Sequence, residues 1–163
     1  MKPKFYFFPF LLLGLGAACG PSVLQMDYRN FAQGWPADQK AVFAVDVSTD
    51  QPANLMIYVR NNADYPFSNL FLIARLSSGD SLWACDTLEY AMANPRGQWL
   101  GEGFLEVKES KLWWKENFSL PPQPATVEIE HALRYNGDEK ATDPLPGVVG
   151  VGFAIEAIQN RDE

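Results

Sequence analysis

Residues 70–76 read Leu70-Phe71-Leu72-Ile73-Ala74-Arg75-Leu76, and this stretch decides the fold of the 163-residue chain. Every second residue from Leu70 onward is apolar, so on a strand these side chains would share one face. The next four residues, Ser77-Ser78-Gly79-Asp80, are typical of a turn. The pattern therefore predicts that residues 82–92 return beside 70–76 as the second strand of an antiparallel hairpin.

Short runs of the same kind recur along the chain, separated by Gly, Pro and Asn, whereas helical periodicity is weak. These runs predict further strands at 42–47, 55–60, 104–107, 116–120, 127–133 and 148–158. With the hairpin they make about eight strands, spaced as in a sandwich. The predicted fold class is all-β: an antiparallel β-sandwich, immunoglobulin- or jelly-roll-like, preceded by a lipoprotein signal peptide.

The first residues have the form of a secretory leader. Lys2 and Lys4 give a positive start, residues 5–15 are apolar, and Gly16-Ala17-Ala18 leads to Cys19. These are the three parts of a signal peptide. We expect residues 1–18 to be removed and Cys19 to be lipidated, although Gly16 stands where a lipoprotein signal usually has Leu. The alternative is an ordinary signal peptide cut after Ala18, with no lipid.

Lipidation would hold the protein at a membrane without a membrane-spanning helix. The apolar segment 5–15 is too short to cross a bilayer, which takes roughly 20 residues as a helix. Stable anchoring needs more than one acyl chain, and a bacterial lipoprotein cysteine carries a diacylglyceryl group and usually an N-acyl chain. The predicted organisation is a cleaved leader (1–18), a lipidated tether (19–30) and one β-sandwich domain (31–160).

The mature chain is acidic. Removing the leader leaves 145 residues, with 11 basic and 20 acidic side chains and a formal charge of −9. This length is sufficient for one domain with a core. The charge argues against binding to nucleic acid and against a polybasic contact with lipid headgroups.

No catalytic residue, metal ion or cofactor is predicted. With Cys19 lipidated, Cys85 has no disulfide partner and is expected to be a small buried apolar residue. His131 is the one histidine, and nothing in the sequence places it beside Cys85 as Cys/His catalysis would require. Glu128 and Glu130 share one strand face, and glycosidases use paired carboxylates. Alternation with Val127 and Ile129 instead favours the solvent-exposed face of a half-buried strand.

Five tryptophans offer either core packing or exposed binding surfaces. We expect Trp83 and Trp99 in the core. Trp113 and Trp114 are adjacent, so on a strand one of them points outward. These two residues, with Asp64 and Tyr65, form the candidate interaction surface, and turn architecture is the alternative for Asp64 and Tyr65. Stacking of the tryptophans on sugar rings leaves an envelope-tethered carbohydrate-binding module as an alternative function.

Five blocks in order resemble the GldH family, the gliding motility lipoproteins of Bacteroidetes-type bacteria. The first spans residues 58–72 and includes Asn61-Asn62-Ala63-Asp64-Tyr65-Pro66. The others are Asp86-Thr87-Leu88-Glu89-Tyr90, Gly97-Gln98-Trp99-Leu100-Gly101-Glu102-Gly103, Ile129-Glu130-His131-Ala132-Leu133-Arg134 and residues 145–152. Together they span nearly the whole mature chain.

The resemblance implies a lipid anchor, a β-sandwich and membership in the gliding apparatus of the cell envelope, which is coupled to type IX secretion. It implies no enzymatic activity and offers no catalytic residues to carry over. The expected function is a non-enzymatic docking or stabilising component whose partners are the membrane and other gliding or secretion proteins. The expected location is the outer membrane, facing the periplasm.

Overall fold

The computed structural model describes residues 22–103, 105–135, 137 and 139–158. Cys19 and the predicted leader lie outside these residues. The described chain forms strands and connecting segments, which confirms the all-β prediction. The eight strands are β1 Val23–Asn30, β2 Ala41–Val45, β3 Ala53–Asn61, β4 Asn69–Ser78, β5 Ser81–Ala91, β6 Lys108–Phe118, β7 Ala125–His131 and β8 Val148–Ala157.

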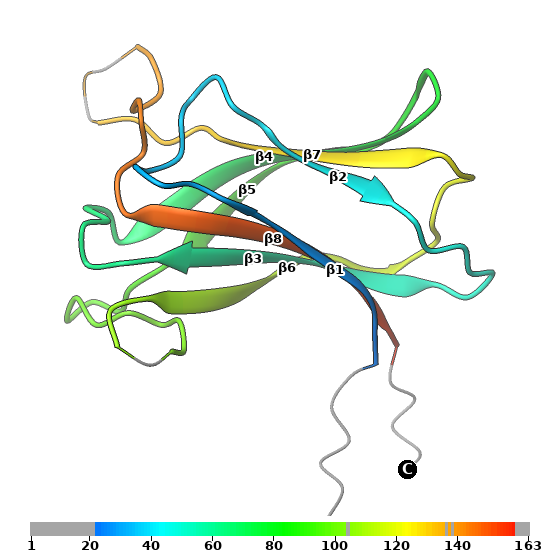
Figure 1. Ribbon diagram of the computed structural model, residues 1–163, viewed down its shortest axis with the longest axis horizontal. Helices are drawn as coiled ribbons and strands as arrows, with labels where there is room; N and C mark the ends of the chain where they lie inside the picture. The colour runs from blue at the N-terminus through cyan, green and yellow to red at the C-terminus, as the bar shows by residue number, and fades with distance from the viewer. Residues whose placement is uncertain (1–21, 104, 136, 138, 159–163) are drawn as a thin grey trace, which may run out of the picture.

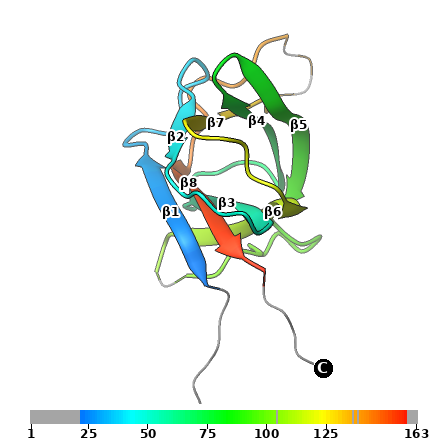
Figure 2. The same cartoon turned by 90° about the vertical axis from the view of Figure 1, so that its right-hand side faces the viewer.

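The strands form two four-stranded antiparallel sheets that pack face to face (Figure 1). The strand order is β1-β8-β3-β6 in one sheet and β2-β7-β4-β5 in the other, and Figure 2 shows them as two layers. Strand pairs β1–β8, β2–β7, β3–β6 and β4–β5 are those of one long hairpin wound around itself. This arrangement is a jelly roll, so the predicted sandwich is confirmed.

Alternating apolar residues of both sheets form the core between them. On β4, Leu70, Leu72, Ala74 and Leu76 are fully buried, as the sequence pattern predicts. They face the inward side of β3 and β8, and the rings of Phe43 and Phe153 meet across the gap at 5.9 Å. Burial of one face of each sheet is what makes this packing favourable. The β4–β5 hairpin is also confirmed, with Gly79 in its turn at a φ of 53°.

Three predicted segments differ from the structure, and all of them concern the edge strands β1 and β6. The predicted tether 19–30 is wrong from Val23 onward, because Val23–Asn30 is strand β1 and pairs along β8. The sandwich domain therefore begins at Val23 rather than at residue 31. The sequence pattern does not predict β1, because β1 is an edge strand with both faces partly exposed. Its apolar and polar residues therefore do not alternate regularly.

The strand predicted at 104–107 is also wrong for the part that is described. Leu105 and Glu106 lie in a turn, and the strand β6 runs through Lys108–Phe118 instead. The strand predicted at 116–120 covers only the last residues of β6. Charged residues dominate the outward face of β6, so the sequence pattern does not reveal the apolar positions Leu112 and Trp114 on its inward face.

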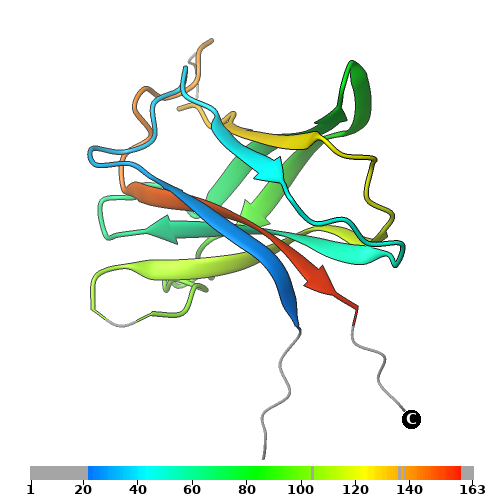
Figure 3. The same cartoon turned by 45° about the vertical axis from the view of Figure 1, so that its right-hand side comes forward.

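The strands run between two ends of the sandwich (Figure 1). The loop end carries the connecting segments 31–40, 62–68, 92–107 and 132–147. The terminal end carries the shorter connections 46–52, 79–80 and 119–124. The start of β1 and the end of β8 also belong to this end, but they lie on its opposite side from the β4–β5 turn (Figure 1). Figure 3 shows the start of β1 beside the end of β8, where Val23 pairs with Glu156.

Candidate functional site

The four residues of the candidate interaction surface lie at two separate places. Asp64 and Tyr65 are in the β3–β4 connection at the loop end, whereas Trp113 and Trp114 are on β6. Asp64 is exposed and Trp113 is 54% exposed, but Tyr65 and Trp114 are only 3% and 7% exposed. Tyr65 and Trp114 are therefore core residues, which corrects their assignment to a surface. The opposite facing of Trp113 and Trp114 is confirmed.

The β3–β4 connection is held by hydrogen bonds of the kind that Asn and Asp favour in turns. The Asp64 backbone N–H donates to Asn62 Oδ1 at 3.0 Å, and the Tyr65 hydroxyl donates to the Asn69 carbonyl at 2.7 Å. The Asn62 backbone N–H donates to the Gly147 carbonyl at 2.9 Å, which ties this turn to the β7–β8 connection. The turn architecture expected for Asp64 and Tyr65 is present, and it leaves the Asp64 side chain at the surface.

Aromatic side chains fill the interior of the loop end. Trp35 is fully buried, and its backbone exchanges hydrogen bonds of 2.9 and 2.8 Å with that of Leu145. His131 packs edge-on against the Trp35 ring, and its Nε2 lies 3.1 Å from the Trp35 carbonyl. Burial lowers the pKa of His131, although the hydrogen bond to the Trp35 carbonyl opposes the shift. Neutral His131 is thus part of the packing that fixes these loops.

The surface of the loop end is hollowed and partly apolar. A groove of about 1010 Å³ lies between the outer face of β4 and the β7–β8 connection, with Phe67, Phe71 and Tyr135 among its lining residues. Large hydrophobic side chains exposed on the loops of this end are Leu100, Leu105, Val107 and Tyr135. Grooves with exposed apolar side chains are typical of protein contact surfaces. The loop end therefore has a grooved, partly apolar surface that can accommodate another protein.

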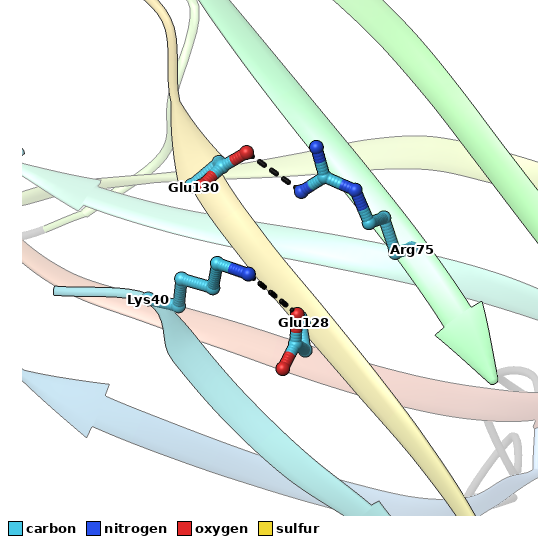
Figure 4. Close-up of polar contacts among 4 residues, drawn as sticks. All are labelled: Lys40, Arg75, Glu128 and Glu130. Carbon is cyan, nitrogen blue, oxygen red and sulfur yellow. Dashed lines mark hydrogen bonds and ion pairs between the residues drawn. The ribbon is translucent and has the colours of Figure 1, made fainter. Parts of the chain in front are cut away.

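Glu128 and Glu130 face outward on β7, as predicted for a half-buried strand, and each is paired with its own cation (Figure 4). Lys40 Nζ lies 2.8 Å from Glu128, and Arg75 Nη1 lies 2.6 Å from Glu130. The two cations come from the segments on either side of β7. A glycosidase needs two carboxylates that both face the scissile bond, whereas here each carboxylate is engaged by its neighbour.

Cys85 and Trp83 lie on edge strand β5 and contradict the prediction that they are buried. Cys85 is exposed on the outer face, opposite Arg75, and Trp83 is 46% exposed near the β4–β5 turn. An edge strand has a neighbour on one side only, so its outward side chains remain accessible. His131 points into the core and Cys85 points out, so the two are not brought together. Trp99 is half-buried and packs against the core, as expected.

The outer face of the β1-β8-β3-β6 sheet carries a polar network that the sequence analysis missed. Glu109 accepts hydrogen bonds from the Tyr28 hydroxyl at 2.9 Å and from Arg60 Nε at 2.6 Å, and the Arg60 guanidinium lies 3.9 Å from the centre of the Tyr28 ring. Burial and the bond to Glu109 raise the pKa of Tyr28 above its usual value. Tyr28 therefore stays a protonated donor near neutral pH.

Beside this triad of Tyr28, Arg60 and Glu109, the same face carries a second triad, which is centred on Glu156. Glu156 is almost fully buried, and it accepts hydrogen bonds from the Tyr58 hydroxyl at 2.9 Å and from Lys111 Nζ at 2.8 Å. One sequence signal predicts this face: Gly150 and Gly152 lie two apart on β8. A Cβ at Gly152 would meet the Tyr28 ring at 2.6 Å, so the glycine makes room for that ring. Two glycines on one strand face indicate a close approach from a neighbouring strand.

Neither a metal site nor a membrane-crossing helix is found in the described part of the chain. No group of three or more His, Cys, Asp or Glu side chains within it is arranged to hold a metal ion. None of its segments is a helix long and apolar enough to cross a membrane.

The chain is similar to curated proteins along almost its whole length. The sequence model of the GldH lipoprotein family matches residues 23–155. A gliding motility lipoprotein GldH homolog of Christiangramia forsetii is 38% identical over 163 residues, which cover 98% of this chain and 100% of the relative. The gliding motility lipoprotein GldH of Flavobacterium johnsoniae is 37% identical over 131 residues, which cover 80% of this chain and 82% of the relative. The chain therefore belongs to the GldH lipoprotein family.

Proposed function

We propose that this chain is a lipid-anchored, non-enzymatic component of a gliding motility apparatus, in which it docks or stabilises other envelope proteins linked to type IX secretion. The observation that carries the proposal is the likeness to two gliding motility lipoproteins over most of the chain. The sandwich boundaries agree with it, because the family match begins at Val23, where β1 begins. The whole domain, rather than a short motif, is the shared unit.

Lipidation of Cys19 provides the anchor in this proposal. The sequence before Cys19 has the three parts of a secretory leader, and the relatives are named lipoproteins. The proposed location is the outer membrane, with the domain in the periplasm. Diacylglyceryl and N-acyl chains together give stable membrane attachment.

Docking is assigned to the loop end. Its connecting segments are longer than those of the terminal end, and they are fixed by buried aromatic packing. They expose Tyr135 in the groove over β4 and Leu100 in a second groove beside β3 and β6. A rigid surface of this kind binds without a large loss of conformational freedom. The side chains that could support catalysis already have structural partners. Glu128 and Glu130 are each ion-paired, and His131 is buried in the core.

Gene deletion and complementation test the proposal. Deletion is expected to abolish gliding and to impair secretion, and the wild-type chain but not Cys19→Ala should restore both. A loop-end double variant, Leu100→Ser with Tyr135→Ser, should fail to restore gliding while its level in the membrane stays normal. Val42→Ala, an exposed position on the outer face of β2, is the matched control and should restore gliding. Unchanged gliding, secretion and partner levels in the deletion strain would refute the proposal.

A carbohydrate-binding function is the second candidate, and one observation favours it. A groove over the outer face of β3 and β6 is lined by Tyr58, Arg60, Glu109 and Lys111, and Trp113 is exposed on the same face. Aromatic rings beside charged hydrogen-bonding groups are suited to sugars. Exposed Trp83 lies on the other sheet, so the two tryptophans do not form one platform. A glycan array with the folded domain decides this, and uniformly flat binding would reject it.

A further inference from the structure

The strand β5 has a free edge that is long and regular. It lies at the margin of its sheet, and in the described part of the chain it pairs with β4 alone (Figure 2). A bulge at Trp83 interrupts this pairing near the β4–β5 turn, since Leu82 and Ala84 pair with consecutive residues of β4. Beyond the bulge, residues 84–91 pair with β4 without interruption. About half of the backbone N–H and C=O groups of residues 84–91 therefore point away from β4, toward the free edge.

The edges of β2 and β6 are partly covered by bonds from other parts of the chain. On β2, Gln25 Nε2 donates a hydrogen bond to the Ala44 carbonyl at 2.7 Å. On β6, the backbone of Glu109 exchanges hydrogen bonds of 2.9 and 2.7 Å with the backbone of Glu102. A backbone group that already has a partner offers less to an incoming strand. These two edges are therefore less open to pairing than the edge of β5.

The sequences of the edge strands differ in the same direction. Strand β6 contains three lysines, β2 has only five residues, and β1 contains Arg29 and an irregular register near Gln25. Lysines, short length and bulges are the features by which natural edge strands avoid pairing with another chain. Residues 84–91 of β5 contain no Lys, Arg or Pro. Among the described strands, β5 is therefore the edge that is best suited to accept another strand.

The two acidic side chains of residues 84–91 are held by neighbours in the same copy. Asp86 accepts hydrogen bonds from Trp114 Nε1 at 2.9 Å and from Lys115 Nζ at 3.1 Å. Glu89 accepts a hydrogen bond from Asn69 Nδ2 at 2.9 Å. The charge of Lys115 compensates that of Asp86, which leaves one uncompensated carboxylate on this stretch. A second copy of this acidic chain can therefore approach at the β5 edge without strong repulsion.

The sequence of β5 is complementary to itself in one antiparallel register. A two-fold axis through Thr87, perpendicular to the sheet, keeps the outer faces of both copies on the same side and places the two Thr87 residues opposite each other. Cys85 then lies opposite Glu89 of the second copy. Asp86 lies opposite Leu88, so no two like charges are directly opposed. An axis through Asp86 or Glu89 would place identical carboxylates opposite each other, which is unfavourable.

We propose that two copies of this chain pair through β5 about an axis at Thr87, so that their two four-stranded sheets join into one antiparallel sheet of eight strands. The contact is isologous, as in most homodimers. Pairing of residues 84–90 adds roughly six to eight backbone hydrogen bonds. Trp83, which is 46% exposed, gains the small Ala91 of the second copy as its neighbour. The dimer thus covers the open edge of β5 and part of an exposed tryptophan.

Disulfide trapping of the full-length chain in its own envelope tests the register, with exposed Cys85 as a built-in probe. Residues directly opposite on paired strands have Cβ atoms about 4.5–5.5 Å apart, close to the separation in a disulfide. Glu89→Cys, with Cys85 retained, should therefore give a dimer band on non-reducing gels after mild copper oxidation. Thr87→Cys in a Cys85→Ala background should give a second one. The wild type should give a band several-fold weaker, because its two Cys85 residues are offset by roughly 13 Å, four residues at about 3.3 Å each.

Two controls separate specific pairing from random collision. Val42→Cys in the Cys85→Ala background places a thiol on β2, the opposite edge of the same sheet, where Val42 is 41% exposed, and it should give no band. Adding Thr87→Lys to Glu89→Cys should remove the dimer band, because two ammonium groups would then meet at the axis. Adding Ala44→Lys on β2 instead should leave the band unchanged.

Three results would overturn the proposal. The first is a Glu89→Cys band no stronger than that of the Val42→Cys control, and the second is a Glu89→Cys band that persists with Thr87→Lys. The third is a wild-type band stronger than the Glu89→Cys band, because it would place the axis at Cys85. Thr87 is exposed, so Thr87→Lys should leave the monomer folded, and an unchanged level in the envelope checks this.

Discussion

Gly147→Ala should strongly destabilise the domain, because Gly147 touches the backbone of the β3–β4 turn. Gly147 has a φ of 75°, and a Cβ there would lie 2.1 Å from the Tyr65 nitrogen and 2.5 Å from its Cα. The turn would have to move by more than 1 Å, judged against ordinary carbon contacts of about 3.5 Å. That movement breaks the Asn62–Gly147 backbone hydrogen bond of 2.9 Å.

The magnitude follows from two contributions. The left-handed backbone conformation costs Ala about 1 kcal/mol relative to Gly, and displacing a buried, hydrogen-bonded turn adds about 2–4 kcal/mol. Gly97→Ala is the matched control, since Gly97 has a φ of 78° and nothing within 4 Å of the added Cβ. It should lose only the first contribution of about 1 kcal/mol.

Urea unfolding of the mature chain with Cys19→Ser, which cannot be lipidated, measures both variants. We expect Gly147→Ala to lose about 3–5 kcal/mol of unfolding free energy, which corresponds to a fall in melting temperature of about 10 °C in a domain of this size. A loss for Gly147→Ala within about 1 kcal/mol of that for Gly97→Ala would refute the reasoning, because the turn would then yield without cost.

Three further predictions use the same protein. Trp114→Ala should cost about 3–5 kcal/mol of unfolding free energy and Trp113→Ala about 1 kcal/mol or less, because only Trp114 is buried. Similar losses for the two variants in urea unfolding would contradict the placement of the two side chains on opposite faces of β6. Burial lowers the pKa of His131 from 6.5, so the unfolded chain binds a proton more readily and stability should fall as the pH drops below about 6.5. Unfolding free energies between pH 7.5 and 5 should show a smaller fall in His131→Gln, and an identical fall would assign the pH dependence to other groups. The side chains of Arg75 and Glu130 are 33% and 23% exposed. A double-mutant cycle on this pair should give a coupling free energy of about 0.5–1 kcal/mol. A coupling of zero would mean that the ion pair does not stabilise the fold.

The sequence predicted the strands that have one fully buried face. β4 and β8 were found within one or two residues because their inward side chains are almost all apolar. β1 and β6 were missed or shifted, and both are the edges of one sheet. At an edge, polar and charged side chains replace the alternation on which the prediction relies. The order of strands within each sheet is a property of long-range pairing and was not accessible from local patterns.

The candidate site was predicted less completely. The turn bonds of Asn62 and Asp64 follow from local chemistry and were expected. Exposure of Tyr65, Cys85 and Trp83 depends on which strand is an edge and which loop covers it, so all three were assigned wrongly. The triads around Glu109 and Glu156 join residues 45 to 98 positions apart, and no local pattern predicts such pairs.

Crosslinking of the tagged protein in its own envelope, followed by identification of the captured proteins, tests most directly whether the chain is a tethered docking component. Cys19→Ala serves as the control that removes the anchor. Recovery of gliding or secretion proteins with the wild type, and their loss with Cys19→Ala, is the predicted result. Recovery of peptidoglycan or polysaccharide alone would contradict it and would favour the carbohydrate-binding function.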